Sequence, residues 1–258
     1  MKFLVTNDDG IGSVFLHELV RALGAAGHGV CVAAPRTEQS WIGAAKSRDR
    51  PVHSAPADCG LACPTWIVDG TPSDCVNIAL DHLVPEMPDG VISGINVGLN
   101  ASLGFIIASG TIAGAFEGAL HGLPAVAFSQ DLTPDLYERL KHNGGKPDPG
   151  LHSTLMASAA HAARLAPELV RSTPPRQFVV HNVNFPLPCT AAAGIRRTVP
   201  ARVVLPKLFS AQADDGTHRL VFHQGCDVSP SEPLTDRAAL MAGCISHSVL
   251  DYSKLGAA

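Results

Sequence analysis

The sequence predicts an α/β protein built on a parallel, doubly wound β-sheet, and three observations lead to this fold class. Short apolar stretches alternate with helix-length stretches through the first two-thirds of the 258 residues. Glycines and prolines separate these stretches, as they do at the ends of helices and strands. After about residue 185, β-prone stretches follow one another without a helix between them. The alternation is typical of a parallel sheet, and we expect an antiparallel arm or hairpin beyond it.

The expected strands of the sheet are short apolar stretches bounded by turn residues. They are Lys2–Thr6, Gly29–Ala34, Thr65–Val68, Gly90–Ser93, Ala125–Phe128 and Phe178–Val183. The expected helices lie between them and have apolar residues at helical spacing. They are Val14–Ala26, Pro72–His82, Ser109–His121 and Leu151–Leu165. The stretch Pro134–Pro149, rich in Gly, Pro, Lys and Asp, is expected to be a loop.

The C-terminal part, 186–258, is expected to form a β arm and a terminal helix on the α/β body. Ile195–Leu208 and Thr217–Phe222 are β-prone, and Asp214-Asp215-Gly216 between them is a turn sequence. The whole chain, 1–258, is therefore expected to be a single domain with its α/β core at 1–185.

Composition and charge disfavour several classes of protein. The net charge is −4 and the pI about 6.3, without the clustered Lys and Arg that a nucleic-acid polymer or an anionic membrane requires. We see no apolar segment of a signal peptide and no apolar stretch of about 18 residues that could cross a membrane. We therefore expect a cytoplasmic protein whose seven cysteines are reduced. Cys59 and Cys63 lack the second pair of ligands that a zinc site needs.

The stretch LVTNDDG (Leu4–Gly10) places two adjacent acids, Asp8 and Asp9, where the first strand ends. Ligands of doubly wound sheets bind beyond the carboxyl ends of the strands. One aspartate would suffice to shape the turn or cap a helix. A second carboxylate beside it adds charge repulsion and no further stabilisation of the turn. A bound divalent cation would neutralise both charges and remove the repulsion. Asp8 and Asp9 are therefore candidate metal ligands, with turn formation as the alternative.

Two further oxygen-bearing side chains follow other expected strands. Ser40 ends the segment APRTEQS after the second strand, and Asn96 ends the segment SGIN after the fourth. Hard cations such as Mg²⁺ prefer oxygen ligands and keep several waters. Taken singly, each residue is also compatible with an ordinary loop position.

A glycine recurs at every fourth residue from Gly110 to Gly122, along one face of an expected helix. Each interior glycine destabilises a helix by about 1 kcal/mol relative to alanine, so this face must pack closely against a neighbour. At the helix start, Ser109, Gly110 and Thr111 offer two hydroxyls and free backbone N–H groups. This arrangement suits a phosphate group. It equally suits a serine that caps a tightly packed helix.

Together these segments resemble the SurE family, the stationary-phase survival proteins. The matching segments, in chain order, are TNDDG at 6–10, AAP followed by Ser40, GTPSDCV at 70–76, ISGINVGLN at 92–100, SGTIAGAFEGALHGLPAVAFS at 109–129 and, more faintly, TDRAALMAGCISHS at 235–248. A single NDDG would be weak support, whereas several segments in order over most of the chain are specific.

The resemblance implies a Rossmann-like, three-layer α/β/α body with a C-terminal β-hairpin arm exchanged between the subunits of a homodimer or homotetramer. It implies hydrolysis of phosphate monoesters, mostly nucleoside 5'- and 3'-monophosphates. It also implies one divalent ion per subunit, Mg²⁺ or Mn²⁺, and the expected metal ligands are Asp8, Asp9, Ser40 and Asn96. The expected phosphate contacts are Asn96, Ser109, Gly110 and Thr111. Either aspartate could take a proton from the attacking water, so both are candidate catalytic residues.

Two departures from the family pattern concern the leaving group. Trp41 follows Ser40 where the family has glycine. The segment Ala101–Ala108 is one residue longer than usual, lacks the family's acids and ends in alanine where the family has tyrosine. The expected metal and phosphate residues are intact, so these departures put the nucleoside leaving group in question and leave the metal site as expected.

The sequence therefore predicts a metal-dependent 5'-nucleotidase acting on a small phosphate monoester. One alternative is a dedicated phosphatase for a non-nucleotide or biosynthetic metabolite, which Trp41 and the altered segment 101–108 favour. Another is a nucleotide-binding protein without turnover, against which the intact acid pair argues. A dinucleotide oxidoreductase is disfavoured, because GIGSVF at 10–15 lacks the third glycine of the dinucleotide fingerprint.

Overall fold

Nine strands form one sheet in the computed structural model, which describes residues 1–256. The central strands are parallel and lie side by side in the order β4-β2-β1-β5-β6-β7. They are β4 (Thr65–Val68), β2 (Gly29–Pro35), β1 (Lys2–Thr6), β5 (Gly90–Val97), β6 (Ala125–Gln130) and β7 (Val179–Phe185). A short strand, β3 (Ser54–Pro56), adds to β4 in the antiparallel direction. The predicted doubly wound parallel sheet is confirmed.

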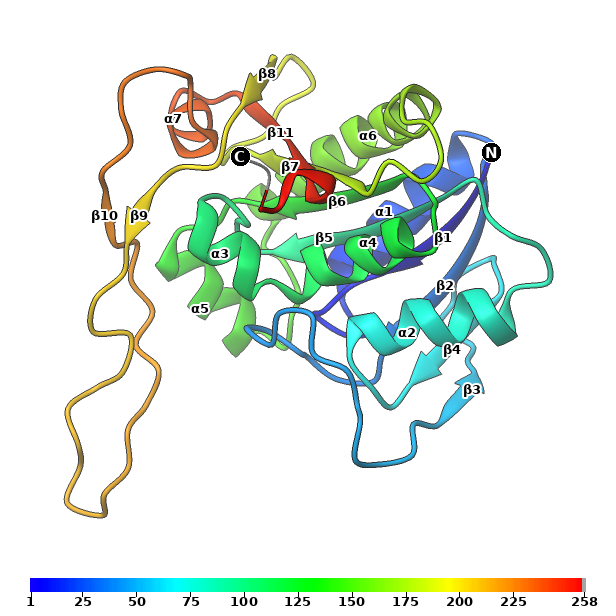
Figure 1. Ribbon diagram of the computed structural model, residues 1–258, viewed down its shortest axis with the longest axis horizontal. Coiled ribbons are helices and arrows are strands. Elements are labelled where there is room, and N and C mark those ends of the chain that lie inside the picture. The colour runs from blue at the N-terminus through cyan, green and yellow to red at the C-terminus, as the bar shows by residue number, and fades with distance from the viewer. Residues whose placement is uncertain (257–258) are drawn as a thin grey trace.

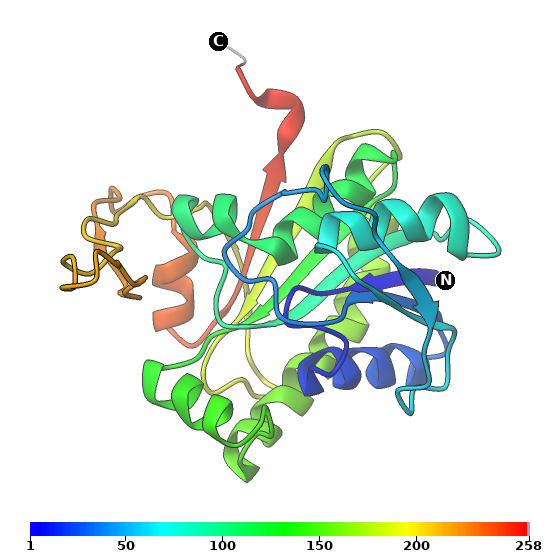
Figure 2. The same cartoon turned by 90° about the horizontal axis from the view of Figure 1, so that it is seen from below.

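Helices cover both faces of the sheet (Figures 1 and 2). On one face α1 (Val14–Ala25) packs against α6 (Pro149–Ser172), and on the other α2 (Pro72–Ile78) packs against α4 (Gly110–Leu120). A wider helical turn, η1 (Ala79–Leu83), continues α2. The four predicted helices are all present, and α6 extends well past its predicted end. The largest group of buried apolar side chains lies between the sheet and the α1–α6 layer.

The glycine face of α4 lies directly on the sheet. An added Cβ at Gly118 would fall 2.5 Å from Cβ of Val91 on β5, and one at Gly114 would fall 2.9 Å from Cγ2 of Thr6 on β1. The close packing predicted for this helix is therefore confirmed. Because α4 contributes no side chain at these contacts, it lies close to the sheet, and its first turn lies beside the end of β1.

The region after residue 185 differs from the prediction. Two of its strands, β8 (Ile195–Thr198) and β11 (Ile245–Asp251), join the main sheet, where β11 pairs antiparallel with β7 and parallel with β8. The helix expected near the end is α7 (Asp236–Met241), which directly precedes β11. The boundary predicted at 185 therefore does not separate the sheet from the arm.

The arm itself is less regular than predicted. In the described part of the chain it pairs through β9 (Val203–Val204), β10 (Cys226–Asp227) and one bridge between Phe209 and Leu220. Long strands over 195–208 and 217–222 are therefore a wrong prediction. The β-prone side chains there have no sheet face on which to pack, and Pro206 lacks the N–H that a continuous ladder needs. In Figure 1 the arm extends away from the body as an open loop.

Two further helices lie near the carboxyl ends of the central strands. α3 (Leu103–Ala108) follows β5, and α5 (Pro134–His142) occupies most of the stretch predicted to be a loop. That prediction is wrong because α5 has its own start signal: the Thr133 hydroxyl accepts a hydrogen bond from the Leu136 N–H, and proline occupies the first turn. None of the helices within residues 1–256 is both long and apolar enough to cross a bilayer.

A pair of largely buried histidines joins β7 to β11. Nδ1 of His181 and Nε2 of His247 are hydrogen-bonded at 2.9 Å, and Nε2 of His181 is 2.6 Å from the hydroxyl of Thr173. Burial and, to a smaller extent, the positive charge of Arg197 on β8 lower the pKa of His181 to about 4. Burial, then the neighbouring His181 and Arg197, lower the pKa of His247 to about 4. Both rings are therefore neutral in the folded protein near pH 7.

We expect the free energy of unfolding to fall on acidification from about pH 6.5 to about pH 4. In this window the unfolded chain protonates both histidines while the folded chain keeps them neutral, so the unfolded state binds more protons and gains stability. Each histidine can contribute up to about 1.4 kcal/mol per pH unit. Urea denaturation across this range should show a flatter slope for His247→Gln than for the unsubstituted chain. His152→Gln, on the exposed side of α6, is the control, and equal slopes in all three proteins would contradict the expectation.

Candidate active site

The candidate site lies at the point in the sheet where the strand order reverses, between β1 and β5. From β1 the chain proceeds outward to β2 and β4, and from β5 it proceeds the other way to β6 and β7. Ligands of doubly wound sheets bind at the carboxyl ends of the strands at such a switch point. A cavity of about 590 Å³ opens here, lined among others by Asp8, Ser40, Asn96 and Ser109. Four of the predicted site residues, from four separate segments, therefore meet at one cavity.

Asp8 and Asp9 follow β1 and line two adjoining cavities. Asp8 is buried and accepts a hydrogen bond from the hydroxyl of Thr111. Asp9 lines a neighbouring cavity of about 270 Å³, and its Oδ2 accepts a hydrogen bond from the N–H of Val97 at 2.9 Å. Burial raises the pKa of Asp8 to about 6. Burial, and then the charge of Asp8, raises the pKa of Asp9 well above its usual range.

Ser40 and Asn96 lie on the wall of the cavity that Asp8 lines. The Ser40 hydroxyl donates to Glu38 at 2.8 Å. The Asn96 side-chain amide donates to the carbonyl of Gly98 at 2.7 Å, and the amide oxygen of Asn96 is thereby left available as a ligand. Glu38 lines both cavities, and its charge contributes to the raised pKa of both aspartates. Sequence reasoning missed Glu38, although an acid two residues before Ser40 could have indicated it.

The oxygen atoms gathered at this edge suit a hard divalent cation such as Mg²⁺ or Mn²⁺. Two neighbouring carboxylates carry the charge that such an ion needs, and a hydroxyl and an amide oxygen add neutral ligands. Within residues 1–256 no three His, Cys, Asp or Glu side chains form a metal-binding group. An ion at this edge would therefore depend on Ser40, Asn96 and water in addition to the aspartates.

A bend in β5 brings Asn96 and the Val97 N–H to the site. Gly94 has a φ of +125°, and any side chain there would clash with the carbonyl oxygen of Phe128 on β6. The register between β5 and β6 shifts between Ser93 and Asn96 at the same point. Only glycine tolerates both this φ angle and this contact. The SGIN segment therefore needs a glycine at position 94 for β5 to bend.

The first turn of α4 lies against Asp8. Ser109 caps the helix, since its Oγ accepts a hydrogen bond from the N–H of Ile112 at 3.1 Å. A Cβ at Gly110 would lie 2.8 Å from Cβ of Asp8, so the backbone of this turn and the acid are in close contact. The Thr111 hydroxyl is buried and directed to Asp8. The capping role of Ser109 is therefore confirmed. The phosphate contacts of Ser109, Gly110 and Thr111 stay a prediction.

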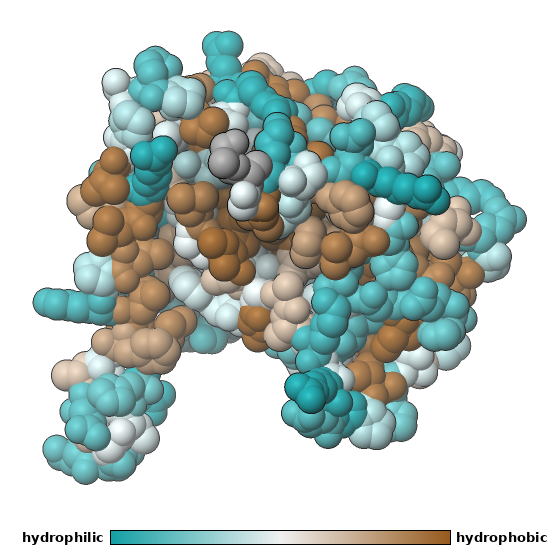
Figure 3. Space-filling model, viewed as in Figure 1, coloured by the Kyte–Doolittle hydropathy of each residue, from teal (hydrophilic) through white to brown (hydrophobic). Residues whose placement is uncertain are grey.

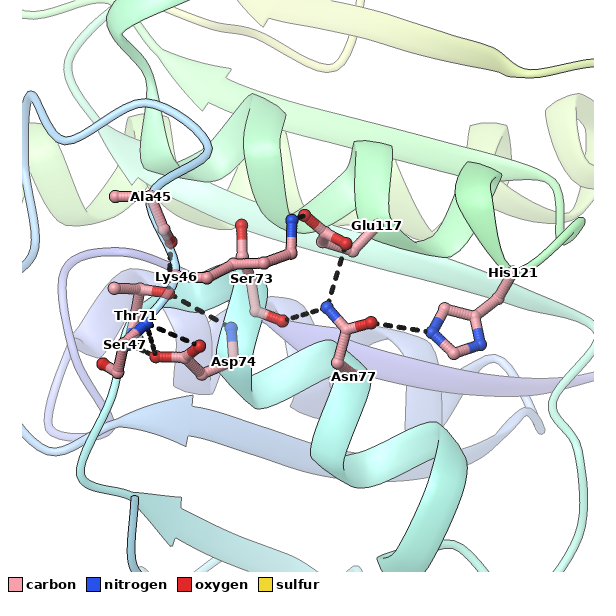
Figure 4. Close-up of polar contacts among 9 residues, drawn as sticks. All are labelled: Ala45, Lys46, Ser47, Thr71, Ser73, Asp74, Asn77, Glu117 and His121. Atoms are coloured by element: carbon pink, nitrogen blue, oxygen red, sulfur yellow. Dashed lines mark hydrogen bonds and ion pairs between the residues drawn. The ribbon is translucent and has the colours of Figure 1, made fainter. Parts of the chain in front are cut away.

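The loop at 36–53, which carries Ser40, is held on α4 by a buried acid (Figure 4). Lys46 of the loop forms an ion pair with Glu117 of α4, whose carboxylate is buried. The same carboxylate accepts a hydrogen bond from Asn77 on α2 at 2.9 Å, and Asn77 bonds in turn to His121 at 2.9 Å. Because Glu117 is satisfied from both sides, this contact is a firm anchor for the loop.

A second set of contacts fastens the same loop to the start of α2. The N–H of Ser47 donates to Asp74 at 3.1 Å, and the Thr71 hydroxyl donates to the carbonyl of Ala45 at 2.7 Å. Asp74 and Thr71 also form a reciprocal capping box at the start of α2. The GTPSDCV segment therefore has a positioning role.

Helix α5 and the arm complete the wall of the larger cavity. Sequence reasoning placed neither of them at the site, because α5 was predicted to be a loop and the arm lies far along the chain. Their lining residues are Pro134, Tyr137, Glu138 and Lys141 from α5, and Leu220, Phe222 and Gln224 from the arm.

A family model described as Survival protein SurE matches residues 3–205. The chain belongs to the SurE family. Over its full length it is 35% identical to the 5'-nucleotidase SurE of Solidesulfovibrio magneticus, in an alignment that covers 94% of that protein. With the 5'-nucleotidase SurE of Pseudomonas paraeruginosa it shares 34% identity over 98% of this chain and 93% of that protein. The resemblance found in the sequence is confirmed.

Other relatives match this SurE-family chain over less of their length or at lower identity. The 5'-nucleotidase SurE of Synechococcus elongatus is 38% identical over 55% of this chain, and the match spans 60% of that protein. The crystal structure of the SurE protein from Aquifex aeolicus is similar with a TM-score of 0.74 at 25% identity, over 99% of this chain and 97% of that one. The expected Rossmann-like, three-layer architecture is therefore confirmed at the level of the whole fold.

We expect Gly110→Ala to weaken divalent-ion binding by roughly tenfold to a hundredfold, since changes to the groups that position metal ligands have effects of this size. The added methyl group would press on Asp8 and on the carbonyl of Gln39, 3.1 Å away. Calorimetric titration with Mn²⁺ measures the affinity, and the melting temperature reports the fold. Gly24→Ala in α1 is the matched control, because nothing lies within 4 Å of its added Cβ. Unchanged affinity in a folded Gly110→Ala protein would contradict this view of the site.

Proposed function

We propose that this chain is a divalent-metal-dependent phosphatase that hydrolyses nucleoside 5'- and 3'-monophosphates to nucleoside and phosphate. The observation that carries the proposal is the meeting of Asp8, Ser40 and Asn96 with the first turn of α4 at one cavity. Asp9 lines the adjoining cavity. Membership of the SurE family, with relatives named 5'-nucleotidase SurE, supports the same activity.

Asp8, Asp9, Ser40 and Asn96 would hold one Mg²⁺ or Mn²⁺ ion per subunit. When bound, such an ion neutralises charge on the phosphoryl group and lowers the pKa of a water molecule. Hydrogen bonds within the protein hold the two carboxylates in place. The Thr111 hydroxyl holds Asp8, the Val97 N–H holds Asp9, and the Gln39 N–H donates to the backbone carbonyl of Asp8 at 2.7 Å.

The first turn of α4 would bind the phosphate. Gly110 and Thr111 lie in the first turn of α4, whose backbone N–H groups have no partner within the helix and where the helix dipole favours an anion. The Thr111 N–H also acts on the Asp8 carboxylate. Ser109 and Asn96, on the wall of the same cavity, add a hydroxyl and an amide within the same space. In this arrangement the phosphate of the ester would lie beside the aspartates, and its leaving group would occupy the rest of the cavity.

Proton transfer falls to the aspartates. Asp8 or Asp9 would accept the proton of the attacking water, and the side chain that does so must lie within hydrogen-bond reach of that water. Asp9 has Oδ1 available for this, because its Oδ2 is bonded to the Val97 N–H.

The proposal extends to assembly and location. The arm, with its exposed apolar side chains Val204, Val221 and Val228, is suited to contact a second copy in a homodimer or homotetramer. We infer a cytoplasmic location, in agreement with the seven free thiols.

We expect Asp8→Asn to lower phosphatase turnover by orders of magnitude while the fold is retained. Asparagine can still accept the Thr111 hydrogen bond but lacks the charge that the ion requires. The measurement is phosphate release from adenosine 5'-monophosphate with Mg²⁺ or Mn²⁺, with circular dichroism to check the fold. Asp49→Asn, at an exposed loop position, is the control. A near-normal rate in Asp8→Asn would rule out this role for Asp8.

Chelation should abolish activity reversibly. In EDTA the phosphoryl charge has no metal to neutralise it, and the aspartates repel an anionic substrate. Phosphate release should therefore vanish in EDTA and return when Mg²⁺ or Mn²⁺ is added in excess. Activity that persists in chelator would refute the metal-dependent scheme.

A further inference from the structure

Three aromatic side chains from separate parts of the chain form one wall of the larger cavity. Trp41 comes from the loop at 36–53, Phe105 from α3 and Phe222 from the arm. Ring centroids lie 5.5 Å apart for Trp41 and Phe105, 5.9 Å for Phe105 and Phe222, and 6.4 Å for Trp41 and Phe222. We name these three residues the aromatic wall. Phe105 is buried behind the other two, whereas Trp41 is 37% exposed and Phe222 is 49% exposed.

The backbone of Trp41 adopts an unfavourable conformation at this wall. Its φ is +63°, in the left-handed region, which a bulky residue rarely adopts. The neighbouring Gly43 holds the loop in this shape, since its N–H donates to the carbonyl of Ala108 at 2.9 Å. Strain of this kind persists only where the surroundings impose it, and it is concentrated at functional sites. The result is a large indole surface kept at the cavity.

A segment late in the chain fixes the other two rings. The buried carboxylate of Asp236 accepts hydrogen bonds from the N–H of Ser102, at the start of α3, and from the N–H of Ala201, at the base of the arm. The guanidinium carbon of Arg237 lies 5.2 Å from the centroid of the Phe105 ring, and Nη1 donates to the carbonyl of Gln224 at 2.7 Å. The wall is therefore preorganised by α7.

Most of the surface that lines the cavity is apolar. Leu99, Leu132 and Leu220 line it in addition to the aromatic wall. Outside the expected metal and phosphate residues, its polar side chains are Glu38, Asn100, Tyr137, Glu138, Lys141 and Gln224. Figure 3 shows that hydrophobic surface continues from the body onto the upper part of the arm, while the tip of the arm is hydrophilic. A leaving group that lies against the aromatic wall would meet ring faces, which carry no pattern of hydrogen-bond donors and acceptors.

We propose that this site selects phosphate monoesters whose leaving group carries a large planar aromatic ring, which stacks on the exposed surface of Trp41 and Phe222. The inference rests on the proposed phosphatase activity and names the substrate class. Recognition by stacking accepts any ring of sufficient area, so purine esters are preferred over pyrimidine esters, and both over a sugar phosphate without a base. An aryl phosphate with two fused rings and no base is accepted as well.

The first test compares kcat/KM for adenosine 5'-monophosphate, 1-naphthyl phosphate, cyclohexyl phosphate and ribose 5-phosphate, with Mg²⁺ or Mn²⁺. We expect the two aromatic esters to exceed the other two by roughly 5- to 100-fold, the range that one stacked ring contributes to binding. Trp41→Gly and Phe222→Ala should each reduce this preference, whereas Phe209→Ala, on the arm but outside the cavity lining, should retain it. Three outcomes would overturn the inference and leave the phosphatase proposal intact. They are a higher kcat/KM for cyclohexyl phosphate than for 1-naphthyl phosphate, a much lower kcat/KM for 1-naphthyl phosphate than for adenosine 5'-monophosphate, and an unchanged preference in both wall variants.

The second test needs no turnover and no metal. Trp41 and Trp66 are the two tryptophans, so the full-length Trp66→Phe protein reports Trp41 fluorescence alone. Adenosine, which carries no phosphate, should quench this signal saturably, and ribose should leave it unchanged. Phe222→Ala in the same background should raise the adenosine Kd by roughly 5-fold or more. Quenching that is absent, or equal for ribose, would overturn the inference. If no ester is hydrolysed with any metal, the phosphatase proposal fails while this titration still decides the role of the wall.

Discussion

The repulsion between the neighbouring carboxylates of Asp8 and Asp9 is the constraint on which the rest of the site depends. Each acid is held by a different donor, Asp8 by Thr111 and Asp9 by the backbone of Val97. Both donors lie on elements that the sheet order brings to the end of β1, namely α4 and β5. Two neighbouring carboxylates, of which Asp8 is buried, need compensation by hydrogen-bond donors or cations, and the surrounding structure supplies the donors.

Small residues make that arrangement possible. Gly114 and Gly118 let α4 lie on the sheet without intervening side chains, and Gly110 lets its first turn touch Asp8. Gly94 lets β5 bend so that Asn96 reaches the same edge. These glycines lower helix and strand propensity, and the close backbone contacts offset that loss. Many residues in the sequence motifs of this chain are therefore required because they allow close backbone contacts, and only a few positions carry the chemistry.

Local pattern was sufficient to predict the parallel sheet, the helices on its faces and the positions of Asp8, Ser40 and Asn96. Asp8 and Ser40 follow the ends of β1 and β2, and Asn96 is the last residue but one of β5, which is longer than the predicted strand. Local pattern was insufficient where structure depends on distant partners. β11 joins the sheet only through its pairing with β7 and β8, and α5 was hidden by a composition typical of loops. The arm has β-prone residues without a sheet to receive them. Lining residues such as Tyr137 and Phe222 followed from no motif, since only the folded chain brings them to the cavity.

The two halves of the cavity are built by different forces, and this explains why the sequence predicts one better than the other. Around the aspartates, hydrogen bonds and close contacts at glycines fix the positions of the surrounding groups, so few residue types are allowed there. Beside Trp41, recognition depends on exposed ring area, which several side chains could supply and which the anchors Glu117 and Asp236 hold from outside the cavity. A substitution at the aromatic wall can therefore alter that surface while the hydrogen bonds around the aspartates keep their geometry. Trp41, held at a φ of +63°, lies on the same loop as Ser40, so this loop contributes to both parts of the cavity.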